Sequence, residues 1–109
     1  MDEPGWYQVK IERGVVCVLL HGEFDIVESA ELEAALLPLV EQPGARVEVD
    51  MSDVEFFGSS GLRALLAAHE RATTCGSSLT VVAESDVCTR VFDLAGVADR
   101  LHGCGPSAG

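Results

Sequence analysis

Two adjacent serines, Ser59 and Ser60, are the residues of this sequence best placed to do chemistry. They open an apolar helical pattern, so their hydroxyls are expected beside unpaired backbone N–H groups and the positive end of the helix dipole. That position favours negative charge, and a phosphoserine adds about −1.5 to −2 charges near pH 7. Gly58 and Gly61 flank the pair and let another protein's backbone come close. The pair is therefore a candidate phosphorylation site.

A purely structural interpretation of the same residues stays open. Serine is a common N-cap, so Ser59 could serve only to cap the helix while Gly61 only allows tight packing. Asp25 could likewise be no more than the cap of an earlier helix. Arg63, one turn into the later helix, either contacts an acidic partner or a nearby phosphate, or is simply solvated.

Catalysis is not expected from this chain. The sequence lacks a P-loop, a G-x-S-x-G nucleophile elbow and an H-E-x-x-H zinc motif, and no base can be assigned to Ser59. His21 and His69 have no second histidine or carboxylate cluster at ligand spacing, so both are interpreted as packing or partly buried residues. Neither a metal nor another cofactor is expected.

The four cysteines show no paired C-x-x-C spacing and are expected to remain thiols in a reducing compartment. They are Cys17, Cys75, Cys88 and Cys104. Cys17 lies in an apolar strand pattern and is interpreted as core filler. His102-Gly103-Cys104 is too sparse to form a metal site.

Composition narrows the choice of partners. Among 109 residues, 18 acidic and seven basic side chains give a net charge of −11, which repels nucleic acid and anionic lipid surfaces. The longest apolar run, residues 15–20, is far too short to span a membrane, and residues 1–4 lack the features of a signal peptide. The chain is expected to be a cytoplasmic protein that binds other proteins.

The elements that position the serines follow from hydrophobic periodicity. Tyr7, Val9 and Ile11 alternate with polar residues, which predicts a strand with one buried face, joined by a hairpin turn to a strand over residues 15–20. Asp25 or Ser29 caps a first helix, which Pro38 should kink or end.

Later elements alternate between strand and helix. Strands are predicted over residues 47–51 and 79–83. One helix is predicted over residues 60–74, ended by Gly76, and another is capped by Ser85 or Asp86 and ended by Gly96. The order β-β-α-β-α-β-α predicts an α/β fold with a mixed sheet of four to five strands, the fifth being a short one near residues 100–101. Residues 1–109 are expected to form one domain, with a core over about 7–102 and a frayed tail over 103–109.

Three segments of the sequence resemble the STAS family, typified by anti-sigma factor antagonists. Asp50-Met51-Ser52, Phe56 and Ser59-Ser60-Gly61-Leu62 match the family's strand, loop and helix start in order and spacing. Residues 22–25 match its Gly-Glu-Leu-Asp loop, and residues 90–97 resemble its last helix. The resemblance covers about residues 7–102.

The resemblance implies that the unphosphorylated chain binds an anti-sigma factor of the serine kinase type and so frees a sigma factor. Phosphorylation, at Ser59 or else at neighbouring Ser60, would end that binding. Residues 22–25 and the residues around Ser59 each follow a strand, and the two strands are expected to end at the same edge of the sheet. A single partner-binding surface is therefore expected. Its predicted members are Gly22, Glu23, Phe24, Asp25, Phe57, Gly58, Ser59, Ser60, Gly61 and Arg63.

Gly58 departs from the family pattern, which usually has an aspartate immediately before the serine. The change removes a hydrogen-bond acceptor and a charge beside the hydroxyl. An alternative function follows from it, in which the chain is a STAS scaffold subunit of a larger assembly, transporter-associated or of the stressosome type, without a phosphate switch. The sequence does not determine the oligomeric state.

Overall fold

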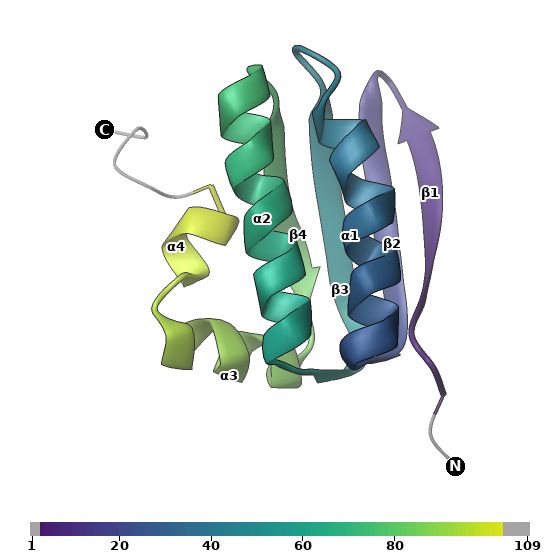
Figure 1. The fold of residues 1–109 in the computed structure, drawn as a ribbon, viewed down its shortest axis with the longest axis vertical. Coiled ribbons are helices and arrows are strands. Elements are labelled where there is room, and N and C mark those ends of the chain that lie inside the picture. The colour runs from purple at the N-terminus through teal and green to yellow at the C-terminus, as the bar shows by residue number, and fades with distance from the viewer. Residues whose placement is uncertain (1–2, 104–109) are drawn as a thin grey trace.

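In the computed structural model, which describes residues 3–103, two long helices lie side by side over one face of a four-stranded sheet (Figure 1). The strands are β1 (Trp6–Glu12), β2 (Val15–Phe24), β3 (Arg46–Phe57) and β4 (Ser78–Glu84). The helices are α1 (Ile26–Val40), α2 (Ser59–Cys75), α3 (Asp86–Ala95) and α4 (Ala98–Leu101). The strands are ordered β1-β2-β3-β4; the first pair is antiparallel and the other two are parallel. The predicted mixed α/β fold is confirmed.

The core lies between the sheet and the helices. Alternate residues of the central strands, such as Val18, Leu20 and Val49, point toward α1 and α2 and meet Leu36 and Leu65. Burial of each such side chain stabilises the fold by about 1.5–3 kcal/mol relative to exposure. The residues between them lie on the sheet face that the helices leave uncovered. The fold therefore has one fully packed face and one open face.

The prediction that β1 buries one face is wrong. Tyr7, Val9 and Ile11 are 41%, 44% and 73% exposed. The reason is geometric: α1 packs against β2 and β3 and stops short of the edge strand (Figure 1). Alternation of apolar and polar residues shows which positions share a face, and it does not show whether a helix covers that face.

Two strands run further than their apolar patterns indicate. β2 continues through residues 22–24, and β3 continues to Phe57, so most of the expected loops at these positions are strand. The two extensions pair with each other, Glu23 with Phe56 and Phe24 with Phe57, across register shifts in the ladder. Backbone pairing stabilises them although their residues do not alternate regularly.

The helix termini mostly follow the predicted signals. Asp25 is the N-cap of α1, and its backbone N–H donates to Glu28 Oε1 at 3.2 Å. Ser29 lies inside the helix, and α1 runs through Pro38 before it ends two residues later, at Val40.

The ends of the later helices also agree with their signals. Ser85 caps α3, whereas Gly76 and Gly96 end α2 and α3 in left-handed conformations. The short fifth strand predicted at residues 100–101 is instead α4, because Leu101 turns into the core. Most of the tail predicted to be frayed, and Cys104, lie outside the described residues.

The start of the described chain is tied to the far end of β2. Gly5 N–H donates to Glu23 O at 2.7 Å, and Glu23 N–H donates to Glu3 O at 3.0 Å. Gly22, with φ +85°, lets this crossing occur, because a Cβ there would lie 2.8 Å from the carbonyl oxygens of Glu3 and Pro4. Residues 3–5 therefore lie beside the end of the sheet at which α1 and α2 begin.

Candidate functional site

The site predicted from the serines lies where β2 and β3 end and α1 and α2 begin. Gly58 N–H donates to Phe24 O at 3.2 Å, which joins the residue before α2 to the residue before the α1 cap. Because parallel strands finish at the same edge of a sheet, residues 22–25 and 58–63 come together there. The expected proximity of the two segments is confirmed.

Ser59 and Ser60 occupy different environments. Ser59 is exposed at the first position of α2, whereas Ser60 is half-buried and its Oγ donates to Ser29 Oγ of α1 at 3.2 Å. Ser29 is buried between the helices. One step along a helix turns the side chain by about 100°, which is enough to separate a free hydroxyl from a packed one. Of the two serines, Ser59 is the one open to another protein.

The N-cap of α2 is Gly58, with extended backbone at φ −83° and ψ −179°, so the interpretation of Ser59 as the cap is wrong. The first helical hydrogen bond runs from Leu62 N–H to Gly58 O at 3.1 Å. The N–H groups of Ser59, Ser60 and Gly61 precede it and point out of the helix end. The first turn of α2 contains no acidic residue, so an anion here would meet donors and the positive helix end.

Gly61 and Gly58 face the two phenylalanines at the end of β3. A Cβ at Gly61 would lie 2.8–3.1 Å from the Phe57 ring, which is closer than side chains tolerate. A Cβ at Gly58 would lie 3.3 Å from the Phe56 ring, a tight but adjustable contact. The packing interpretation of Gly61 is therefore correct, and the aspartate usual at position 58 would have to displace the Phe56 ring slightly.

Four of the predicted partner-contact residues cannot contact a partner through their side chains. Gly22, Phe24, Phe57 and Gly61 are buried, Phe57 being only 2% exposed. Phe24 and Phe57 belong to the core, Gly61 of α2 packs on the Phe57 ring, and Gly22 lies against residues 3 and 4, so all four support the surface from beneath. Glu23 and Gly58 are partly exposed, and Asp25, Ser59 and Arg63 are exposed.

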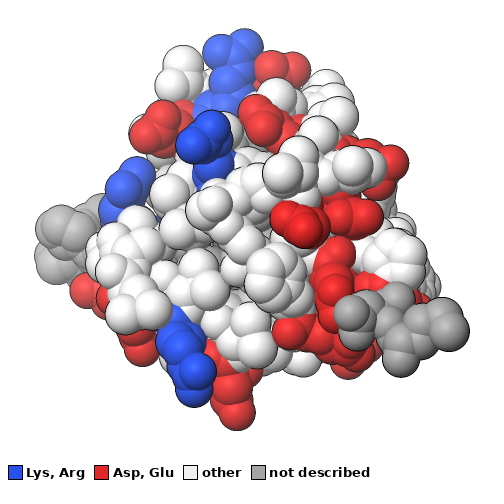
Figure 2. Space-filling view, turned by 60° about the horizontal axis from the view of Figure 1, so that its bottom comes forward, with Lys and Arg blue, Asp and Glu red and all other residues white. Residues whose placement is uncertain are grey.

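Sequence reasoning missed three exposed apolar residues at this end. They are Ile26, Val27 and Phe56, the last of which is 44% exposed. Figure 2 shows this end as a broad uncharged area bordered on one side by acidic side chains. A signal was available for Phe56, since two consecutive strand residues point to opposite sides and Phe56 and Phe57 cannot both be core.

Two shallow grooves flank the exposed apolar residues. One, of about 430 Å³, runs along the start of α1 and is lined by Pro4, Glu23, Asp25, Ile26, Val27 and Glu28. The other, of about 380 Å³, runs along α2 and is lined by Ser59, Leu62, Arg63, Leu66, Ala67 and Glu70. Both are open and combine apolar stems with charged rims, which suits contact with a protein surface.

Two histidines and three described cysteines are not among the residues predicted to contact a partner. His21 is half-buried in hydrogen bonds on the open sheet face, and burial, followed by the charge of Arg100, lowers the pKa of His69. Burial raises the pKa of the Cys88 thiol. Cys17 and Cys75 are half-buried thiols. Cys17 precedes Val18, which faces the helices, so Cys17 lies on the open face of the sheet and its interpretation as core filler is wrong.

Within residues 3–103, no group of three histidine, cysteine or carboxylate side chains is arranged to hold a metal ion. In the same part of the chain, no helix has the length and apolar character needed to cross a bilayer.

The sequence and the fold of this chain are similar to those of known anti-sigma factor antagonists. The anti-sigma-B factor antagonist of Bacillus subtilis (strain 168) is 30% identical over 93 residues, covering 85% of this chain and 84% of the relative. The anti-sigma-F factor antagonist RsfB of Mycobacterium tuberculosis (strain H37Rv) is 36% identical over 86 residues, covering 77% and 68%.

A crystal structure of an anti-sigma factor antagonist from Mycobacterium paratuberculosis superposes with a TM-score of 0.76 at 32% identity, covering 90% of this chain and 82% of that one. The family model described as "Mlab, STAS domain" matches residues 7–103. With that match across nearly all of its described residues, the chain belongs to the STAS domain family, among relatives that are anti-sigma factor antagonists.

Proposed function

We propose that this chain is an anti-sigma factor antagonist that binds an anti-sigma factor of the serine kinase type, and that phosphorylation of Ser59 ends the binding. The observation that carries the proposal is the exposure of Ser59 at the first position of α2, beside exposed apolar residues. The names of the similar proteins support the class of partner. The chain would act by binding and not by catalysis, in the cytoplasm where sigma factors work.

The switch would work through local charge. A phosphate on Ser59 would place about −1.5 to −2 charges at the edge of the apolar area. The N–H groups of the first turn of α2 would hold it without refolding the domain. A partner that buries Ile26, Val27 and Phe56 would then have to desolvate a dianion, which is costly without a matching cation. Arg63, which lines the same groove one turn further along α2, would pair with the phosphate on this chain's own surface.

Phosphorylation is tested by incubating the chain with candidate anti-sigma kinases and ATP and measuring intact mass. We expect a gain of about 80 Da, assigned to Ser59 by fragmentation. The gain should be absent in Ser59→Ala and present in Ser60→Ala. A gain that persists in Ser59→Ala would show that another hydroxyl is the acceptor.

Partner binding is tested by titration calorimetry with the same kinases. Ser59→Asp should weaken binding by at least about tenfold, or about 1.4 kcal/mol. Ser59→Asn has the same shape without the charge and should stay close to wild type. If Asn weakens binding as much as Asp does, the size of the side chain and not its charge controls the interface.

Gly58 favours a second function, that of a scaffold subunit which is never phosphorylated. Without the usual aspartate, the hydroxyl of Ser59 has no neighbouring carboxylate on its N-terminal side. The two functions differ in one result: a scaffold would bind its partner stably and gain no mass with any kinase. Gly58→Asp should then fail to create an acceptor, whereas it should speed phosphorylation if the switch exists.

A further inference from the structure

The outer edge of β1 is an unpaired strand edge. β1 is the terminal strand of the sheet, and all seven of its residues are exposed. Every second residue of β1 directs its N–H and C=O groups away from β2. On that outer side, the described structure provides no strand to pair with them. Such an edge can accept a further strand without any change in the fold.

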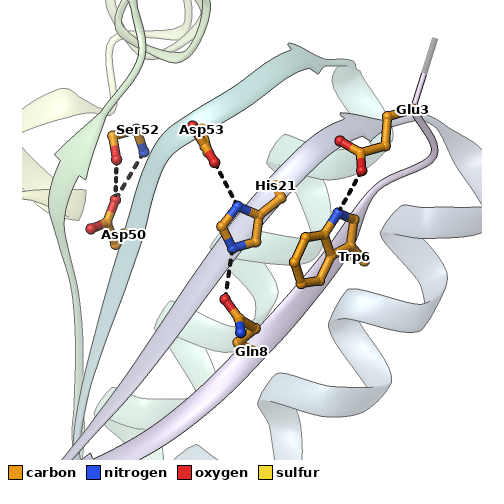
Figure 3. Close-up of polar contacts among 7 residues, drawn as sticks. All are labelled: Glu3, Trp6, Gln8, His21, Asp50, Ser52 and Asp53. Carbon is orange, nitrogen blue, oxygen red and sulfur yellow. Dashed lines mark hydrogen bonds and ion pairs between the residues drawn. The ribbon is translucent and has the colours of Figure 1, made fainter. Parts of the chain in front are cut away.

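β1 is held rigidly enough to act as a template. It pairs with β2 without a break from Trp6↔His21 to Glu12↔Val15. On the open face the Trp6 ring stacks on His21 at 4.2 Å, and Trp6 Nε1 donates to Glu3 Oε2 at 3.2 Å (Figure 3). His21 also hydrogen-bonds Gln8 Oε1 at 3.0 Å and Asp53 Oδ2 at 2.7 Å. Through His21, these contacts link the side chains of β1 to those of β2 and β3.

The apolar residues of β1 are arranged symmetrically along the strand. Tyr7, Val9 and Ile11 share the helix-side face, and α1 leaves all three exposed. If a second β1 runs antiparallel and is centred on Val9, Tyr7 lies opposite Ile11 of the second copy and Val9 lies opposite Val9. The apolar side chains of two β1 strands can therefore pack against each other.

Charge also favours a second copy of this chain as the occupant. From Glu3 to Arg13 the chain carries two acidic residues, Glu3 and Glu12, and two basic ones, Lys10 and Arg13, so this segment is neutral in a chain of net charge −11. In the register centred on Val9, Lys10 lies opposite Gln8 and Glu12 lies opposite Trp6. No like charges are then directly opposed, and two molecules that repel each other elsewhere can meet along this edge.

We propose that β1 pairs antiparallel with β1 of a second copy, about a two-fold axis at Val9, so that two sheets join into one. A two-fold arrangement closes on itself and uses up both free β1 edges. The exposed area of the three apolar side chains is on the order of 300 Å² per copy, below the roughly 800 Å² per partner of standard interfaces. The dimer is therefore weak and reversible, forming at high micromolar concentration.

Sedimentation velocity over a concentration series tests the proposal, with the fluorescence of Trp6, the single tryptophan, as a second signal. Wild type should shift from monomer toward dimer as concentration rises, and added salt should strengthen the dimer by screening the net charge. Val9→Lys should weaken association at least about tenfold. Val82→Lys, at a 53% exposed valine on the opposite edge strand β4, is the matched control and should leave it unchanged.

A disulfide cross-link reports the register and, because it traps a transient dimer, needs no tight binding. Val9→Cys should form a disulfide-linked dimer under mild oxidation, with the bond between the two position-9 sulfurs identified by peptide mass. Ile11→Cys should not form the corresponding bond, since those sulfurs would lie about 14 Å apart along the seam.

Three results would overturn the proposal. They are a wild-type chain that stays monomeric at millimolar concentration, equal cross-linking at both positions, and equal loss of association in Val82→Lys. The circular dichroism spectrum of each variant should match that of wild type, which checks that the fold is retained.

Discussion

The start of α2 and the outer edge of β1 both expose apolar side chains, yet they differ in what surrounds those side chains. At α2, the exposed Ser59 hydroxyl lies at the same end of the sheet as exposed Phe56 and Ile26, and Gly58 N–H joins the start of the helix to the end of β2. At β1, Val9 and Ile11 flank a bare backbone edge that only β2 supports. The first surface can be switched by a modification, whereas the second offers hydrogen bonds to any matching strand. Exposed apolar area therefore indicates binding, and the neighbouring polar groups indicate what kind of binding.

The largest effect on stability is expected from a substitution in the packing beneath the start of α2. Gly61→Val should lower the free energy of unfolding by about 1–3 kcal/mol or more, because the new side chain would collide with the Phe57 ring. Urea unfolding followed by circular dichroism measures the loss. Gly58→Ala, which meets Phe56 at the looser distance of 3.3 Å, should cost less than about 1 kcal/mol. Equal losses would mean that the clearance at Phe57 does not matter.

A smaller effect is expected on the β1 side. His21→Ala should lower stability by about 1–2 kcal/mol, because it removes the hydrogen bonds to Gln8 and Asp53 and the stacking on Trp6. It should weaken self-association measured by sedimentation while kinase binding changes little. Ser52→Ala, which removes the 2.6 Å bond from Ser52 Oγ to Asp50 on the same face, should affect neither process. A larger loss of kinase binding than of self-association would contradict the separation of the two surfaces.

The pair of serines beneath the α2 surface should matter less still. Ser29→Ala should cost about 0.5–1.5 kcal/mol, because the Ser60 hydroxyl loses its acceptor at 3.2 Å but can still reach solvent. A double-mutant cycle with Ser60→Ala isolates the pair. Phosphate incorporation at Ser59 should be the same in both single variants. A strong drop in Ser60→Ala would show that Ser60 takes part in the modification.

The smallest effect is a pH dependence that belongs to neither surface. Burial, and then the charge of Arg100, lowers the pKa of His69 in the folded chain below the ordinary 6.5, so the unfolded chain binds this proton more tightly. The contribution of neutral His69 to stability is intact above the ordinary pKa and is lost as pH falls through the lowered one. The stability of wild type relative to His69→Gln should therefore decrease from pH about 7.5 to about 5.5. Thermal unfolding measures it, and a constant difference would contradict it.

The sequence predicted the α2 site better than it predicted either surface around it. Gly58, Ser59 and the helix end at Gly76 carry local signals of turn and cap chemistry, and the structure places the helix within a residue of them. Coverage of a strand face by a helix is not encoded in the local sequence. For that reason the sequence wrongly predicted that Tyr7 and Val9 are buried and that Phe57 contacts a partner protein. Whether a strand face is covered depends on where a helix from elsewhere in the chain comes to lie. The difference between Ser59 and Ser60 likewise depends on Ser29, which lies 31 residues before Ser60.

The crossing of residues 3–5 over the end of β2 has a practical consequence for handling the protein. Pro4 lines the groove beside Ile26 and Val27, so residues 3–5 themselves lie at the end of the domain that carries Ser59. A fluorophore attached at position 4 would therefore report the arrival of a kinase.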